Sequence, residues 1–572
     1  MTTARTSSAL HTATVLLAAL VLGACASAPT SPPAPAYQPA VASAHPLATQ
    51  AGLDILAAGG NAFDAAVATA AVLGVVEPYS AGIGGGGFWL LQGETGGTVF
   101  VDARETAPGQ AHETMYLDAS GEVHPDKLSV NGPLAAGIPG QPAAFVHLSE
   151  NYGELPLSQT LARAIELARE GFEADQHYRD MARWRQPVLA RYPAAAATFL
   201  RDGQVPPAGT LIRQPELAGT LEQLARQGRE GFYQGEVAAQ LVNDVQAAGG
   251  IWTLNDLADY RVIEREPVVI EVGRYRIWSA PPPSSGGIAM AQMFGMMEAR
   301  PFASLEVGQL DPDTARVHYL AELMRRAYRD RALYLGDPDY TDIPMDKLTD
   351  PDYLAGLVDS LSMSRATPSD SLPGDLASGT HTTHLSVLDA KGNRVSATLS
   401  INLPFGSAFL SRQTGVLLNN ELDDFAIKPG VPNAYGLVGG EANKVEAGKR
   451  PLSSMTPTLM WGPERSAIIG TPGGSRIITM VFLGLLDVMN GKSAQAVVSE
   501  GRFHHQYLPD VIQHEPDTFS PEVMAQLREL GHELRDVERR YGNMQLILVD
   551  PEGNAEAASD PRGIGAARVA KP

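Results

Sequence analysis

The chain has 572 residues, of which 44% are hydrophobic and 19% charged, so it is long enough to bury one large core or two to three domains. Its formal net charge of −21 argues against nucleic acid as a partner, because a phosphate backbone requires a basic face. Aromatic residues are few (6%), while 57 glycines and 42 prolines favour a loop-rich α/β enzyme over a helical bundle.

Residues 1–24 have the pattern of a secretory signal peptide. Arg5 precedes an apolar run over 14–22 that is too short to span a bilayer. The run ends in Leu-Gly-Ala-Cys, which is similar to a bacterial lipoprotein signal in which Cys25 is acylated and becomes the first residue. An Ala-x-Ala site at 24–26 leaves open a plain secretory signal and a soluble periplasmic protein. Cys25 is the only cysteine, so an intrachain disulfide is impossible.

The stretch after Cys25 predicts an extended tether over 25–43. Five prolines lie between positions 28 and 40 among Ala, Ser and Thr. Ala26 directly after the cysteine resembles an outer-membrane address. We therefore expect the protein in the bacterial cell envelope, on the periplasmic side, with the N-terminal lipid as its membrane contact.

The first part of the body predicts two helices, at 47–58 and 62–76, and the second is apolar on all sides and therefore buried. A glycine-rich run at 82–87 matches the pattern G-x-G-x-x-G. It follows a helix and leads into a strand at 88–91, which is the reverse of the order in a dinucleotide-binding fold. We therefore expect these glycines to allow close backbone packing beside a buried site.

A strand at 99–102 leads to Arg104, which, taken alone, would be interpreted as part of a structural ion pair.

The segment from 156 to 250 predicts amphipathic helices that serve as scaffold. The predicted helices of this segment are 157–170, 175–192, 214–227 and 235–248. A β-hairpin at 268–278, a Met-rich helix at 288–297 and a long helix at 313–333 follow.

The sequence around Thr382 predicts a flexible linker that runs directly into a hairpin. Pro, Ser, Gly and Asp are frequent in the linker, which covers about 366–381, and two β-prone runs around Gly392-Asn393 then form the hairpin. A threonine hydroxyl needs an adjacent base, and a chain cut before Thr382 would supply its own α-amine, whose pKa lies near about 8. The alternative interpretation of this pattern is a Thr-rich edge strand on an ordinary hairpin.

Other chemistries have little support in the sequence. The adjacent pair His504-His505 is not accompanied by a His-x-x-x-His spacing or a cysteine cluster, so we interpret both as structural and predict no metal site. The sequence contains neither G-x-S-x-G nor a P-loop lysine, which argues against a serine-elbow hydrolase or an NTPase.

Several motifs in matched order resemble the γ-glutamyltranspeptidases, a family of N-terminal-nucleophile hydrolases. The resemblance extends from about Val41 to Pro561. Its motifs are Thr-Thr-His-x-Ser at 382–386, Gly-Asn-x-Val-Ser-x-Thr-x-Ser-Ile-Asn at 392–402, Leu-Leu-Asn-Asn-Glu-Leu-Asp-Asp-Phe at 417–425, Lys-Arg-Pro-Leu-Ser-Ser-Met-Thr-Pro at 449–457 and Gly-Thr-Pro-Gly-Gly-Ser-Arg at 470–476.

The resemblance implies a four-layer αββα sandwich built jointly by two subunits of one precursor. The bond between His381 and Thr382 would be cleaved autocatalytically, leaving a large subunit, 44–381 after the tether, and a small subunit, 382–572, as a heterodimer. Thr382 would then attack the γ-glutamyl amide of glutathione or a related donor and pass the acyl group to water or to an amino acid or dipeptide acceptor. The family requires no metal and no organic cofactor.

The resemblance also assigns roles to individual residues. Gly473 and Gly474 would donate backbone N–H groups to the oxyanion, and Ser400 would hydrogen-bond the Thr382 hydroxyl. The α-carboxylate of the donor would be held by Arg104, Ser453 and Ser454, and its α-ammonium by Asn402, Glu421 and Asp424. Tyr435 lies in 428–449, which resembles the lid loop of a subset of the family. Many members have threonine at the Ser400 position and some bacterial members have glutamine at the Glu421 position.

Two alternatives to this function remain. A cephalosporin or glutaryl acylase would share the fold and the processing, but Asp424, Ser453-Ser454 and the lid-like segment argue against it. An inactive, envelope-anchored scaffold protein would not need Thr382 or the pair Gly473-Gly474.

Overall fold

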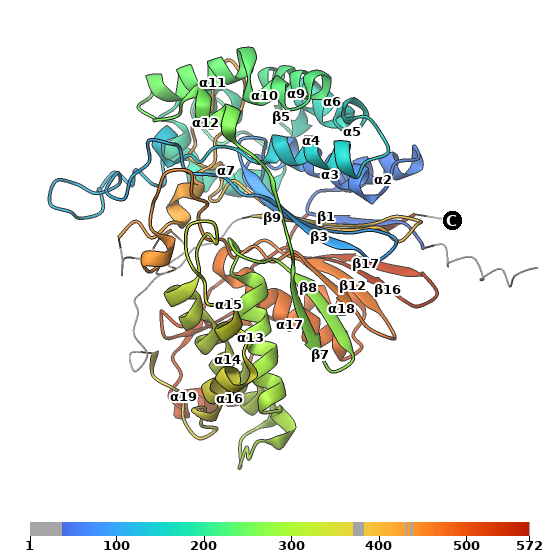
Figure 1. Cartoon of the computed structure of the whole chain (residues 1–572), viewed down its shortest axis with the longest axis vertical. Helices are drawn as coiled ribbons and strands as arrows, with labels where there is room; N and C mark the ends of the chain where they lie inside the picture. The colour runs from blue at the N-terminus through green and yellow to red at the C-terminus, as the bar shows by residue number, and fades with distance from the viewer. Residues whose placement is uncertain are drawn as a thin grey trace, which may run out of the picture. The chain divides into compact units, whose positions relative to one another are not determined.

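Two antiparallel sheets lie face to face in the middle of the structure, and helices cover the outer face of each (Figure 1). The predicted four-layer αββα sandwich is therefore confirmed. The computed structural model of the chain describes residues 37–369, 382–428, 431, 433–434, 437 and 439–570. Among these residues, no helix combines the length and the apolar character needed to cross a membrane.

The sheets have seven and six strands, and every neighbouring pair in them is antiparallel. The first sheet has the order β18 (Ala566–Val569), β1 (Ala40–Ser43), β9 (Thr383–Leu388), β10 (Arg394–Ser400), β2 (Gly86–Gln92), β3 (Thr98–Ala103) and β6 (Ile263–Arg265). The second has the order β17 (Ala555–Ser559), β16 (Gln545–Val549), β12 (Ser466–Gly470), β11 (Thr458–Trp461), β8 (Tyr275–Ser279) and β7 (Val268–Val272).

Two small sheets complete the strands that the structure describes. One consists of β13 (Phe503–His504), β14 (Ile512–His514) and β15 (Leu534–Asp536), and the other of β4 (Phe172–Glu173) and β5 (Leu211–Ile212).

The predicted hairpin at Thr382 is confirmed as β9 and β10, in which His384 lies opposite Thr398. Strand β9 pairs with β1 on its other side, so it is an interior strand and the alternative of an edge strand is wrong. The pairing with β1 also corrects the predicted tether, because residues 40–43 are buried sheet residues. Both sheets contain strands from before and after position 381, so the two predicted subunits share each sheet.

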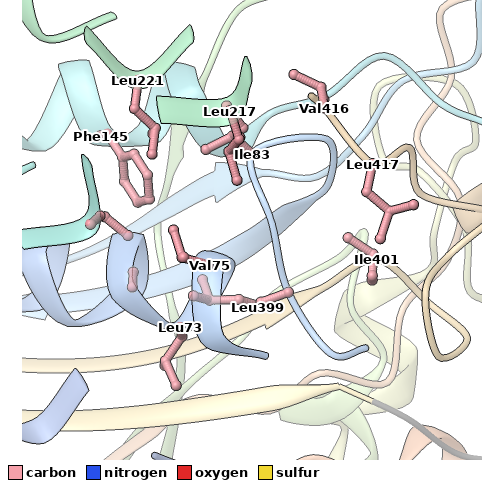
Figure 2. Close-up of a cluster of buried hydrophobic side chains, with 14 of the residues drawn as sticks. Leu73, Val75, Ile83, Phe145, Leu217, Leu221, Leu399, Ile401, Val416 and Leu417 are labelled. Atoms are coloured by element: carbon pink, nitrogen blue, oxygen red, sulfur yellow. The ribbon is translucent and has the colours of Figure 1, made fainter. Parts of the chain in front are cut away.

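Successive side chains of a strand point to opposite faces of the sheet, so neighbouring residues of one strand belong to two different hydrophobic cores. On β2, Trp89 and Leu91 pack into the cluster beneath the first helical layer, whereas Phe88 and Leu90 belong to the cluster that includes the space between the sheets. Helix α3 (Ala62–Val76) is buried at every residue except Gly74, as predicted from its uniformly apolar sequence. Figure 2 shows Leu73 and Val75 of α3 near Leu399 of the sheet.

Most predicted helices are confirmed, although the one at 157–170 is divided in two. On the first side lie α2 (Pro46–Ala57), α3, α4 (Gln141–Asn151), α5 (Leu157–Thr160), α6 (Ala162–Glu170), α7 (Gln176–Leu189), α8 (Pro193–Phe199), α9 (Pro215–Gln227), α10 (Glu230–Tyr233), α11 (Gly235–Ala247) and α12 (Leu254–Asp259). On the second side lie α13 (Gly286–Ala299), α14 (Pro312–Tyr334), α15 (Met345–Leu348), α16 (Pro351–Asp359), α17 (Ile477–Met489), α18 (Ala494–Ser499) and α19 (Pro521–Glu529).

Candidate active site

Thr382 lies directly before the interior strand β9, and its residue surface is only 7% exposed. Two cavities meet at this residue. The first has a volume of about 20 Å³ and the second about 330 Å³, and Thr382 lines both. A threonine hydroxyl at this position can therefore react with a group in one cavity while another group occupies the second.

The first cavity brings together most of the residues that the sequence predicts for the site. Its lining includes Arg104, Thr382, Ser400, Asn402, Glu421, Asp424, Ser453, Ser454 and Gly474. Gly473 lines the second cavity instead. Three further predicted positions, Cys25, His381 and Tyr435, lie outside the residues that the structure describes.

Arg104 makes ion pairs with two of the predicted acidic residues. Its Nη1 donates to Glu421 Oε2 at 2.6 Å and its Nη2 to Asp424 Oδ2 at 2.5 Å. Its Nε donates to the carbonyl oxygen of Pro451 at 3.1 Å. The sequence assigns Arg104 to the α-carboxylate of the donor and the two acids to its α-ammonium, and the structure brings the three side chains into contact.

A guanidinium has five N–H groups, and these bonds use three of them. Within the described part of the chain, one N–H on each terminal nitrogen of Arg104 therefore has no hydrogen-bond partner, although Nη1 also lies 3.7 Å from Glu105 Oε2. A cavity of about 20 Å³ holds about one water molecule. A larger ligand must therefore separate some of the side chains that now touch.

Local packing fixes Arg104 at the end of β3. The Tyr260 hydroxyl donates to the carbonyl oxygen of Arg104 at 2.8 Å, and the Arg104 N–H donates to Asp102 Oδ1 at 3.0 Å. Because the backbone is held on both sides, the guanidinium enters the cavity from a rigid position.

Two acids beside Arg104, Glu105 and Asp424, have pKa values that burial raises. Glu105 is 0% exposed, and neither carboxyl oxygen has a hydrogen-bond partner within the described residues. Burial raises the pKa of Glu105 well above its usual range, the charge of Glu421 raises it further, and Arg104 opposes the rise. Burial also raises the pKa of Asp424, again opposed by Arg104. Burial and the opposing charge of Arg104 therefore act together on the pKa of both Glu105 and Asp424.

The hydroxyl of Ser454 is held by a residue that the sequence did not reveal. Arg331 on α14 donates from Nη2 to Ser454 Oγ at 3.3 Å and from Nε to Ser285 Oγ at 2.9 Å. The neighbouring Ser453 Oγ accepts the Met455 N–H at 3.0 Å. Arg331 is buried, and burial lowers its pKa. Its position in the predicted long helix at 313–333 gave no local signal of this role.

The turn after β10 places Ser400 and Asn402 against the cavity. The Asn402 N–H donates to Ser400 Oγ at 2.7 Å, and Asn402 has a φ of 70°, which asparagine tolerates better than most residues. Gly85 packs against this turn so closely that a Cβ atom would lie 2.2 Å from the Ser400 carbonyl oxygen. The prediction that the glycine-rich run serves close backbone packing is therefore confirmed.

Gly473 and Gly474 form the turn between β12 and α17. Their φ angles of 150° and 55° lie in the region that favours glycine. A Cβ on Gly473 would also lie 2.4 Å from the Cε atom of Met480. This turn leads through a short 3-10 helix into α17, and the N-terminus of a helix stabilises negative charge.

Glu77, at the end of α3, is a second residue that sequence reasoning missed. Its Oε2 accepts a hydrogen bond from Thr383 Oγ1 at 2.9 Å, and the residue lines the second cavity. Burial raises the pKa of Glu77 from 4.5 to about 7, although the bond from Thr383 opposes the rise. A carboxyl group that titrates near neutral pH therefore lies next to the nucleophile candidate.

The predicted linker begins in a buried polar cluster. The Thr367 N–H donates to Glu322 Oε1 at 3.1 Å, and the Ser369 N–H donates to Asp510 Oδ2 at 2.6 Å. These bonds hold the last described residues before position 370.

The same cluster contains the only group of possible metal ligands found within the described residues, namely His318, Glu322 and His532. Glu322 forms ion pairs with two arginines, and His318 Nδ1 is 2.7 Å from His532 Nε2. These contacts account for the cluster as structural. The predicted structural role of His504 also fits its contacts, because its two ring nitrogens lie 2.8 Å from Thr479 Oγ1 and 2.9 Å from Gln506 Oε1.

Residues 48–570 match the model of the gamma-glutamyltranspeptidase family. The chain belongs to this family. It is 39% identical to the glutathione hydrolase proenzyme of Escherichia coli K12 over 96% of this chain and 97% of that protein. It is 41% identical to the protein of the same description from Pseudomonas aeruginosa PAO1 over 93% of this chain and 95% of the relative.

The solved structures agree with an N-terminal-nucleophile hydrolase fold. A cephalosporin acylase from Bacillus halodurans matches with a TM-score of 0.80 and 27% identity over 95% of this chain and 99% of its own. The gamma-glutamyltranspeptidase of Helicobacter pylori matches with a TM-score of 0.55 and 37% identity, covering 61% of this chain and 97% of its own.

Proposed function

We propose that the protein is a γ-glutamyl transferase and glutathione hydrolase whose nucleophile is Thr382. The observation that carries the proposal is the first cavity, where Thr382 adjoins Arg104, Glu421 and Asp424. One cation and two acids beside a hydroxyl suit a γ-glutamyl donor, because its head carries both a carboxylate and an ammonium group.

The active enzyme forms by cleavage of its own chain. The Thr382 hydroxyl attacks the carbonyl carbon of His381, and the acyl group moves from nitrogen to oxygen. This shift breaks the C–N bond and frees the α-amine of Thr382, which can then act as a base. Water hydrolyses the ester, which releases the carboxylate of His381 and restores the Thr382 hydroxyl. The shared sheets support this step, because strands on both sides of the cleaved bond hold the two subunits together.

Turnover repeats the same chemistry on the substrate. The α-amine takes the proton of Thr382 Oγ as that oxygen attacks the γ-carbonyl, and the proton passes to the amide nitrogen as the C–N bond breaks. Backbone N–H groups at Gly473 and Gly474 stabilise the oxyanion. Water or an acceptor amine then attacks the ester, and Thr382 Oγ regains its proton.

Recognition of the donor uses the remaining residues of the first cavity. The α-carboxylate binds the available N–H groups of Arg104 and the hydroxyls of Ser453 and Ser454. The α-ammonium binds Asp424 and Glu421, with Asn402 beside them. Arg104 already contacts both acids. When the donor binds, its carboxylate and ammonium therefore replace part of the contact between Arg104 and these acids.

A cephalosporin-type acylase is the second candidate, since such an enzyme matches over almost the whole chain. The identity to that acylase is 27%, compared with 37% to a solved gamma-glutamyltranspeptidase and 39% to a curated glutathione hydrolase proenzyme. A glutaryl side chain also lacks the ammonium that would pair with two acids. These observations favour the γ-glutamyl donor.

The location in the cell is part of the same proposal. Cys25 within Leu-Gly-Ala-Cys and the proline-rich stretch after it support a lipid-anchored enzyme of the bacterial envelope that faces the periplasm.

Donor assays test the function most directly. Purified protein should release the leaving group from glutathione and from a γ-glutamyl anilide, and glycylglycine should increase release from the anilide. A glutaryl anilide should be a much poorer donor. Faster hydrolysis of the glutaryl compound than of the γ-glutamyl compound would establish the acylase instead.

A further inference from the structure

The second cavity lies between the end of α3, helix α7 and the loop that connects β15 to β16. Glu77, His177, Thr382, Gly473, Arg539 and Arg540 are among its lining residues. Its volume of about 330 Å³ falls within the range of about 300–1,000 Å³ that is typical of ligand pockets. The first cavity contains the acids and Arg104, so the second is the space available to a group on the other side of a bond that Thr382 attacks.

Some of the charged side chains that line the second cavity are paired with an opposite charge, and others are not. Arg539 and Arg540 are exposed, and neither has a hydrogen bond or an ion pair with another described residue. Of the two acids in the lining, Asp180 is already paired with Arg183 at 2.6 Å, and Glu77 accepts a hydrogen bond from Thr383. Arg562 also lines the cavity but is held by Glu515 at 2.5 Å and by Asp560 at 3.1 Å. The groups left to attract an anion are therefore Arg539 and Arg540.

We propose that Arg539 and Arg540 bind the terminal carboxylate of the peptide that leaves the donor and of the acceptor that replaces it. This inference rests on the proposed γ-glutamyl transfer and adds the specificity of the second cavity. In a dipeptide, the carboxylate lies about 7 Å from the reacting nitrogen, since an extended residue spans about 3.5 Å. A planar guanidinium donates two parallel hydrogen bonds to a carboxylate, so two arginines on one loop form a suitable receptor.

The test compares donors that differ only at the glycine carboxylate. Glutathione and its glycine monoethyl ester are hydrolysed by the wild type and by the Arg539→Gln/Arg540→Gln double variant. We expect the double variant to lose about tenfold in kcat/KM for glutathione, corresponding to about 1.4 kcal/mol, and to change little for the ester. The preference of the wild type for glutathione should also weaken with added salt, because both arginines are exposed.

A matched control is Arg535→Gln, which removes an exposed arginine of β15 whose partner is Glu533 at 3.8 Å. It should leave both donors unaffected. A second arm measures transfer from a γ-glutamyl anilide to glycylglycine and to glycylglycinamide, and the double variant should lose its preference for the first acceptor.

The outcomes separate this inference from the proposed function. If the wild type hydrolyses neither γ-glutamyl donor, the proposed function fails. If it hydrolyses both and the double variant treats glutathione and the ester as the wild type does, the arginines have no role in recognition. Equal losses on both donors would also overturn the inference, because they would indicate a structural effect on the loop.

Discussion

The hydroxyl of Thr383 donates to Glu77 Oε2 over 2.9 Å, and both side chains are buried. The two residues are 306 positions apart in the chain, on opposite sides of the proposed cleavage site. This bond connects the end of α3 to the first residue of β9, and it therefore helps to set the position of Thr382 directly before it.

The buried carboxyl of Glu77 predicts a pH-dependent stability. Burial raises its pKa in the folded protein from 4.5 to about 7, so the folded state binds more protons than the unfolded state between these values. The wild type should therefore lose stability as the pH rises from about 4.5 to about 7, and the loss persists above that range. A pKa change of this size corresponds to about 3 kcal/mol in the free energy of unfolding.

Glu77→Gln removes this titration and keeps an acceptor for Thr383. Denaturant unfolding between pH 4 and pH 8, with Thr382→Ala in both proteins to prevent cleavage, should show the Gln variant gaining stability relative to its parent as the pH rises. Glu173→Gln, at an exposed position, is the control and should show no such trend. A constant difference at every pH would mean that Glu77 does not titrate in this range.

Cleavage at Thr382 is the second prediction. Thr382→Ala should remain one uncut, inactive chain, because the hydroxyl makes the cut and performs turnover. Thr382→Ser keeps the hydroxyl and should still be cleaved. On a denaturing gel the wild type should give two bands, and N-terminal sequencing of the smaller should begin Thr-Thr-His-Leu-Ser. A single uncut chain with full activity would contradict the mechanism.

Lipid attachment at Cys25 is the third prediction. Cys25→Ser should lose labelling by a fatty acid and should leave the membrane fraction, while the protein from Tyr37 onward still folds and hydrolyses the donor. The compact unit that begins at Tyr37 supports this separation of anchor and enzyme. If wild type and variant stay with the membrane to the same extent, the plain secretory signal is the better interpretation.

The features that could be predicted from the sequence are those with a local pattern. The hairpin of β9 and β10 follows from two β-prone runs around Gly392, and buried α3 follows from its uniformly apolar sequence. The resemblance of ordered motifs then placed Thr382, Arg104 and Asp424 in one site, and the structure groups them around one cavity.

The features that could not be predicted depend on distances between segments far apart in the chain. Arg331 lies on α14 and Glu77 directly follows α3, and the sequence patterns of both helices predict only which residues are buried. The partners Ser454 and Thr383 are 123 and 306 residues away. The contact of Arg104 with Glu421 spans 317 residues, and no local rule indicates whether a predicted cation and acid touch each other or bind a ligand separately.

Asp424 provides the fourth prediction, because it can contact the ammonium of the donor while its Oδ2 accepts from Arg104. Asp424→Asn keeps the shape of the side chain and removes its charge. Loss of a charge-assisted hydrogen bond in a buried site costs about 2–4 kcal/mol, or about 30- to 1,000-fold in kcat/KM. Cleavage at Thr382 should continue, since it does not use the ammonium site.

Two comparisons decide whether Asp424 recognises the donor or only supports the turn. Asp423→Asn changes the neighbouring acid, which is held by Ser129 Oγ and the Ala434 N–H at 2.8 Å each and does not line the first cavity. This variant should affect stability more than donor choice. With Asp424→Asn, a γ-glutamyl anilide should lose more than a glutaryl anilide, which has no ammonium to bind. Equal losses on the two anilides, with normal cleavage, would remove Asp424 from ammonium recognition and would favour the acylase.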